Sequence, residues 1–292
     1  RALFPPIQSR LLVSPIPAID RAGLRHACIR TSTHLFSAFT LPEPVALRDR
    51  AAIFLICHRL RIPIPFLPSP PRSHCQTRCP HYPPSKPFPD AHHLATYAYL
   101  ALHALGCGLG GHRHRRHDAL VRLISDCAMR EAHYAVDLKT RLCSSSIKGT
   151  KVDCVLTAHD RFPSVLAIDA TVSCPLLPAH LAAAATDAAT LFTNRTAEKD
   201  AKHLAGCVDL GRTFMAVVFT TIGGIGPSEA TDWIDGLFAA SYVSERLAGG
   251  TGYQTSMRKS RLYQSLHSCC TRGSCGMVEH LALPPAAAAH AL

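Results

Sequence analysis

The chain has 292 residues, of which 47% are hydrophobic and 17% charged, so it can bury a sizeable core as one large domain or two smaller ones. Its formal charge is +11 with 18 histidines uncounted, which favours an anionic partner: nucleic acid first, an acidic membrane surface second. The best candidate for a membrane span, "AAIFLICHRLRIPIPFL", is interrupted by His58, Arg59 and Arg61, which argues against one.

Thirteen cysteines, an odd number, lie between Cys28 and Cys275 without regular spacing. This distribution favours a reducing compartment, in which cysteines fill the core or bind metal instead of forming disulfides. The chain begins with Arg1 and not with methionine, so we expect it to be part of a longer protein.

The first third of the chain has little regular pattern. Residues 1–45 are dotted with prolines and show no sustained periodicity, which predicts a poorly ordered lead-in. Residues 46–111 open with "LRDRAAIFLICHRL", whose apolar residues have the spacing of an amphipathic helix. The prolines of 61–90 are too dense for a helix or an interior strand, so this loop needs something to hold its shape.

Residues 112–283 have a tighter pattern, and 284–292 form a short tail. "RRHDALVRLISDCAMREA" predicts a helix with one apolar face, and "HYAVDLKTRL" alternates as a strand does. Two β-branched runs, "VDCVLTA" and "SVLAIDATV", are joined by a short polar segment and predict a hairpin.

The second half of this region adds a helix and a strand. The alanine-rich segment 178–207 predicts a helix with a break near Thr193 and Asn194. "TFMAVVFTT" predicts a strand buried on both faces, and a glycine turn then leads to a helix from Pro227. With a last helix at "YQTSMRKSRLYQSLHSCC", the order of elements predicts an α/β domain.

Two aspartates lie inside the apolar runs of the predicted hairpin. Asp153 is early in the first strand and Asp169 late in the second, so antiparallel pairing brings them opposite each other. A buried, unpartnered carboxylate costs several kcal/mol, and its partner can be a base, a hydrogen-bond network or a metal ion. Two carboxylates and a backbone carbonyl suit Mg²⁺, which can polarise a phosphodiester and lower the pKa of a bound water. The plainer alternative is that each aspartate pairs with an arginine.

A lysine pair on the following helix could complete such a site. Thr171, and not a lysine, stands two positions beyond Asp169, and the next cations are Lys199 and Lys202. These two are three residues apart on one helix face, and a helix covering the sheet would let either amine reach the acids. The alternative is a solvated lysine pair.

Taken in order, these features resemble the restriction-endonuclease-like fold, the PD-(D/E)xK superfamily, which has an αβββαβ core around a mixed sheet. More narrowly, the chain resembles the C-terminal region of non-LTR retrotransposon polyproteins, which carries such an endonuclease after the reverse transcriptase. The resemblance runs from about Leu47 to Leu283. The stretches that carry it are "HALGCGLGGHRHRRHDAL", "KVD", "LAIDATVSCPL", "KDAKH" and "TTIGGIGP".

By this resemblance Asp153 and Asp169 would be catalytic metal ligands for Mg²⁺ or Mn²⁺, and Lys199 or Lys202 the catalytic lysine, moved onto the helix. Three positions depart from the family's pattern. Val152 replaces a proline, His203 replaces a tyrosine and Asp118 stands where asparagine is usual. None of the three removes a charged catalytic group.

The family also has a Cys-Cys-His-Cys zinc knuckle just before the endonuclease, and the matching positions are Cys75, Cys79, His103 and Cys107. Three thiolates and one imidazole suit tetrahedral Zn²⁺, which would constrain the proline-rich loop. The alternatives are a different histidine ligand, His81, His92 or His93, or no ligand at all.

The densest basic cluster is "HRHRRH", at 112–117, where phosphate contacts would be natural. The predicted nucleic-acid-binding residues are therefore Arg113, Arg115, Arg116 and Lys151. The alternative is that the cluster is a solvated helix start.

The first hypothesis is a metal-dependent DNA endonuclease that nicks target DNA for retroelement integration. The resemblance implies a nuclear location and DNA as the partner, and it leaves retroelement RNA open as a second partner. It also implies an upstream reverse transcriptase domain in the same polyprotein and no association with a membrane. Two alternatives stand beside it: a nucleic-acid-binding module that keeps the fold without catalysis, and a pseudogene fragment without function.

Overall fold

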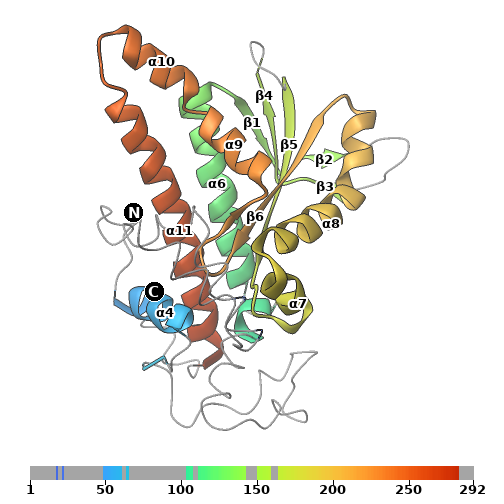
Figure 1. Ribbon diagram of the computed structural model, residues 1–292. Coiled ribbons are helices and arrows are strands. Elements are labelled where there is room, and N and C mark those ends of the chain that lie inside the picture. Colours follow the sequence, from blue (N-terminus) through green and yellow to red (C-terminus); the bar gives the residue numbers. More distant parts are fainter. Residues whose placement is uncertain are drawn as a thin grey trace.

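The computed structural model describes residues 18, 22, 49–60, 64–65, 103–107, 111–142, 150–158 and 164–282. Within them a five-stranded mixed sheet lies between helices on its two faces (Figure 1), so the fold is α/β as the sequence predicts. In spatial order the strands are β1 (Ala135–Leu138), β4 (Cys154–Thr157), β5 (Val165–Ser173), β6 (Thr213–Thr220) and β7 (Ile225–Gly226).

Strand directions follow the connections between the strands. β4 pairs antiparallel with β1 and with β5, so the predicted hairpin is confirmed, with Cys154 opposite Ile168 and Thr157 opposite Val165. β5 and β6 are parallel, because the helices between them carry the chain back to the same edge of the sheet. β7 returns antiparallel to β6 after the glycine turn.

The stretch "HYAVDLKTRL" forms two strands and not one. β1 ends at Leu138, and Lys139 adopts a left-handed backbone with φ 55°, which turns the chain. Beyond the turn, β2 (Arg141–Leu142) pairs with β3 (Thr150–Lys151) in a separate two-stranded ladder beside the main sheet.

Most predicted helices are present, and the described chain adds α10 between two of them. The helices are α4 (Asp49–Leu60), α6 (His112–Ala132), α7 (Pro178–Thr186), α8 (Ala188–Asp209), α9 (Ser228–Gly236), α10 (Ala239–Leu247) and α11 (Tyr253–Ala282). The break predicted near Thr193 and Asn194 was wrong, because α8 runs through both residues and the chain bends at Asp187, whose backbone is extended. α8 packs along β6, and this tertiary packing outweighs the weak helix preference of threonine and asparagine.

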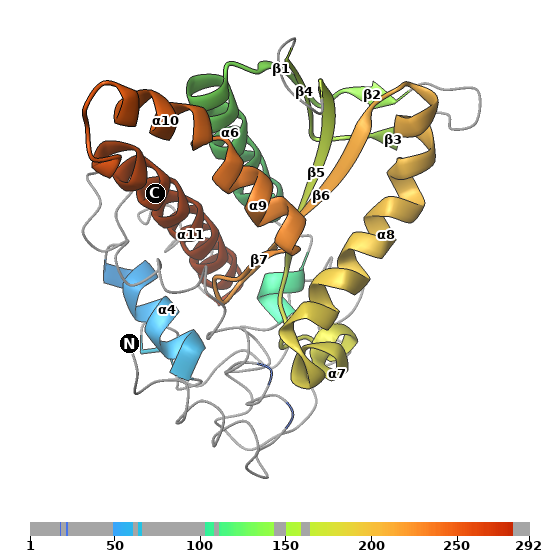
Figure 2. The ribbon, with the colours of Figure 1, turned by 45° about the horizontal axis from the view of Figure 1, so that its top comes forward.

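The two faces of the sheet are covered differently, as the turned view also shows (Figure 2). α6, α9 and α11 cover one face over a large apolar cluster that includes Leu120, Ile124, Leu156, Ile168 and Phe219. α8 covers the other face over a smaller cluster made of Leu142, Val152, Val155, Ala167 and Cys207. The candidate site residues lie where this smaller cluster meets the start of β4.

α4 packs against α11, and its Phe54 and Cys57 join a further apolar cluster with Leu191 and Ile222. No disulfide joins any of the nine cysteines in the described part of the chain. Among the described helices, none combines the length and apolar character needed to cross a membrane.

Candidate active site at the β4–β5 junction

β4 begins with a bulge at Asp153. Cys154 is the residue paired with Ile168, yet the Asp153 amide donates to the Ile168 carbonyl at 3.0 Å. Two residues of one strand thus face one residue of the other, which is the arrangement of a β-bulge and is common beside functional sites. The bulge re-aims the Asp153 side chain towards β5.

The Asp153 carboxylate is held by β5 and by α6. Its Oδ2 accepts a hydrogen bond from the Ala170 amide at 2.6 Å and lies 3.0 Å from Nε2 of His117. The same ring nitrogen is 3.1 Å from the Ala170 carbonyl oxygen, and His117 Nδ1 is 3.4 Å from Asp118 Oδ1. Burial opposes a charged ring, but the hydrogen bonds and charges of Asp153 and Asp118 outweigh it and raise the pKa of His117. Oxygen acceptors lie at both ring nitrogens of His117, so each nitrogen has to donate. Only the protonated ring donates from both nitrogens.

Asp169 lies in the middle of β5 and is contacted from α8. Its side chain is 7% exposed, and its Oδ2 is 2.5 Å from Nζ of Lys199. Among the described residues Oδ2 has no hydrogen bond of good geometry, so the contact is an ion pair. A buried carboxylate needs such a cation, because removing one partner of a buried pair leaves an uncompensated charge.

His203 lies one helical turn beyond Lys199 and is fully buried. Its ring packs 5.6 Å from that of Phe214, centre to centre, and its Nε2 is 3.7 Å from Asp169 Oδ1, too far for a hydrogen bond. In the described structure neither ring nitrogen has a hydrogen-bond partner. Burial lowers the pKa of His203 and so favours the neutral ring.

The structure brings Lys199 to Asp169, whereas Lys202 is exposed on α8 and has no ion pair with either acid in the described structure. Arg195, one turn before Lys199, forms an ion pair with Glu198 and donates weakly to Thr171 Oγ1 at 3.5 Å. The side of α8 that meets β5 thus presents a row of basic side chains.

Sequence reasoning missed three of these residues. Arg195 and His203 lie four positions on either side of Lys199, so the helical period could have identified both. His117 was part of the basic cluster, but its contact with Asp153 depends on how α6 docks on the sheet. No local pattern contains that information.

The donor atoms at this junction fit Mg²⁺ or Mn²⁺ in their chemistry. Burial raises the pKa of the Cys154 thiol to about 11, and the charges of Asp153 and Asp169 add to this effect. Within the described residues, no three histidine, cysteine or acidic side chains form a complete metal cage. Mg²⁺ does not need one, because it keeps several waters and binds through one or two carboxylates and substrate phosphates.

No protein-family model matches this chain. No curated protein is significantly similar to it either. The geometry of the site is therefore the basis for assigning a function.

The predicted nucleic-acid-binding residues fall into two groups. Arg113 and Arg115 are exposed at the start of α6, and Lys151 is exposed on β3. Arg116 is only 3% exposed, and its Nη1 donates to Ser274 Oγ of α11 at 2.8 Å. Arg116 is therefore a core residue at the α6–α11 contact and not part of an exposed phosphate-binding surface.

The zinc prediction is only partly covered by the structure. Cys75 and Cys79, like the substitutes His81, His92 and His93, lie outside the described residues. Within them, the Cys107 amide donates to the His103 carbonyl at 2.8 Å, and the Cys107 side chain is buried. The zinc knuckle stays a prediction.

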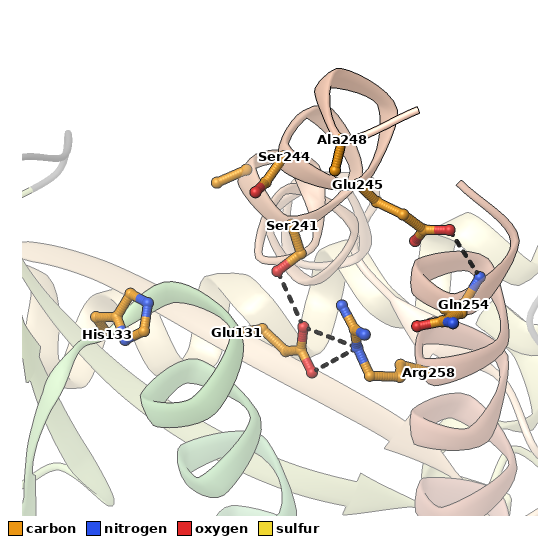
Figure 3. A pocket seen from close by; sticks show the side chains of 9 residues that line it. Glu131, His133, Ser241, Ser244, Glu245, Ala248, Gln254 and Arg258 are labelled. Carbon is orange, nitrogen blue, oxygen red and sulfur yellow. Dashed lines mark hydrogen bonds and ion pairs between the residues drawn. The ribbon is translucent and has the colours of Figure 1, made fainter. Parts of the chain in front are cut away.

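An open pocket of about 440 Å³ lies elsewhere, between the end of α6, α10 and the start of α11. Figure 3 shows Glu131 lying between Ser241 and Arg258, and Glu245 pointing at the backbone of Gln254. Its charged groups are thus engaged with one another or with a helix end. This pattern is typical of helix bracing, so we place the candidate site at the β4–β5 junction.

Proposed function

We propose that residues 112–283 form a metal-dependent DNA endonuclease of the restriction-endonuclease-like fold. Two observations support the proposal: Asp153 accepts a hydrogen bond from the amide of Ala170, the residue that follows Asp169, and the Asp169 carboxylate contacts the Lys199 amine. The order α6, β1, β4, β5, α8, β6 also agrees with the αβββαβ order that the resemblance implies. The target-nicking role in a retroelement follows from the sequence resemblance alone.

Asp153, Asp169 and the Ala170 carbonyl would hold the divalent cation. When bound, the cation supplies polarisation of the phosphodiester and a lowered pKa for a bound water. His117 fixes the Asp153 carboxylate from α6, so the ligand is oriented before substrate arrives. Lys199 places an ammonium at the junction, where it stabilises negative charge that develops on the phosphoryl oxygens.

Nicking of supercoiled plasmid in Mg²⁺ or Mn²⁺ tests the proposal. We expect Asp153→Asn and Asp169→Asn to lower the nicking rate by at least ~10²-fold, because each removes a charge that acts on the reacting phosphate. Glu131→Gln, a matched loss of one acid in the α10–α11 region, should leave the rate unchanged. Nicking that survives in both aspartate variants would overturn the proposal, as would no nicking by protein with a cooperative unfolding transition.

A second candidate is a nucleic-acid-binding module without catalysis. One observation favours it: His117 and Lys199 already compensate both acids without a metal ion. This candidate predicts that the wild type and the aspartate variants all retard DNA in a gel, with no divalent-dependent cleavage by any of them.

A further inference from the structure

The β2–β3 ladder places two cations directly opposite each other. Arg141 of β2 is paired in register with Lys151 of β3, and both side chains are exposed. Residues directly opposite in an antiparallel pair share a face, and like charges in such positions destabilise the pair. In the part of the chain that the structure describes, neither residue forms an ion pair with a carboxylate. Among the described residues the ladder therefore holds two like charges side by side, at a stability cost.

The outward direction of these charges is fixed by what lies beneath. Leu142 follows Arg141 in the chain, and Val152 follows Lys151. The two are 0% and 1% exposed and belong to the small apolar cluster under α8. Because side chains alternate along a strand, burying Leu142 and Val152 forces Arg141 and Lys151 to the outer face.

The ladder is joined to the candidate active site by backbone hydrogen bonds. The Lys139 amide donates to the Asp153 carbonyl at 2.6 Å, and the Val152 amide donates to the Thr140 carbonyl at 3.0 Å. Lys151 precedes Asp153 by two residues.

Two acids of neighbouring described elements lie at the turn before β2. Asp118 of α6 binds Lys139 Nζ at 3.2 Å, and Asp137 accepts from Thr140 Oγ1 at 2.8 Å. In the described structure neither carboxylate forms an ion pair with Arg141 or Lys151.

We propose that the β2–β3 ladder binds the phosphate backbone of duplex DNA beside the bond that is cut, with Arg141 and Lys151 as its contacts. Placing the ladder relative to a cut bond rests on the proposed function; the binding of phosphates does not. One guanidinium and one ammonium group held side by side match the closely spaced anions of a nucleic-acid strand.

Fluorescence anisotropy of a labelled DNA duplex with the full chain in EDTA, over a series of salt concentrations, tests binding without cleavage. Arg141→Ala/Lys151→Ala should weaken binding and reduce the slope of log affinity against log salt by about 1.8, at about 0.9 for each lost phosphate contact. The charge-matched control is Arg246→Ala/Arg261→Ala, on α10 and α11 away from the ladder (Figure 1), and should keep the wild-type slope. Equal slopes for the two double variants, or no DNA binding by the wild type, would overturn the proposal.

Lys151→Glu separates binding from folding. Because it turns a like-charge pair into an opposite-charge pair, thermal stability should be equal to or above that of the wild type while DNA affinity falls. A variant that lost both would indicate that the ladder is only structural. The outcomes also separate the two proposals. A reduced salt slope in Arg141→Ala/Lys151→Ala, with no nicking by the wild type, supports phosphate binding by the ladder and contradicts the nuclease. Nicking by the wild type, with an unchanged slope in the double variant, supports the nuclease and contradicts the ladder.

Discussion

Two ionic clusters in this protein differ in how completely their polar atoms are satisfied. In the α10–α11 pocket, Glu131 accepts from Ser241 and pairs with Arg258, and Glu245 accepts from two backbone amides at the start of α11. At the β4–β5 junction, Asp169 Oδ2 and both nitrogens of His203 have no hydrogen bond among the described residues.

The difference concerns how each cluster pays for burying its charges. Charges that brace helices gain from complete pairing, and the pocket has it. Buried polar atoms without partners are costly and rare in native proteins, and they call for an explanation such as a bound ion, water or a functional role. The junction leaves such atoms unpaired among the described residues where the pocket does not, and the predictions below sharpen this contrast.

The largest expected effect is the loss of the Lys199 charge. Lys199→Met keeps an apolar stem but leaves Asp169 buried and uncompensated, so the free energy of unfolding should fall by about 3 kcal/mol. Urea denaturation followed by circular dichroism measures it. Lys199→Met/Asp169→Asn should recover part of the loss, because no buried charge is then unpaired. A single variant that costs no more than an exposed ion pair would contradict the buried-pair interpretation.

A smaller effect is expected for the matching pair in the pocket. The Arg258 side chain is 43% exposed, so its pair with Glu131 is screened by solvent. A double-mutant cycle with Arg258→Met and Glu131→Gln should give a coupling of about 0.5 kcal/mol, and less in high salt. Coupling as strong as that of Lys199 with Asp169 would remove the contrast between the two clusters.

The smallest effect, and the most specific in pH, is expected at Glu245. Hydrogen bonds from the Thr255 amide and hydroxyl and the Gln254 amide lower the pKa of Glu245. A lowered folded pKa gives stability that is complete above the ordinary value of 4.5 and is lost as pH falls through the folded pKa. Thermal melts should therefore show Glu245→Gln less stable than wild type at pH 7, with the gap closing below pH 4.5. A gap that does not change with pH would show that the charge of Glu245 does not stabilise α11.

Periodicity was enough to find the main elements. Alternating and 3.6-residue patterns located α6, β4, β5, β6 and the antiparallel pairing of β4 with β5, because each of these elements buries one face or both. The same approach failed where backbone geometry outweighs pattern. Lys139 takes a left-handed conformation that splits one predicted strand, and Asp187 breaks the helix in place of Thr193 and Asn194.

For the candidate site, residue type and spacing alone identified the acids Asp153 and Asp169 and a lysine on the covering helix. Those assignments depend on chemistry that a linear sequence carries. Three decisions needed tertiary structure: which lysine meets Asp169, that His117 holds Asp153, and that Arg116 is buried against α11. Each depends on how a helix is rotated and docked on the sheet, which is set by packing between segments far apart in the sequence.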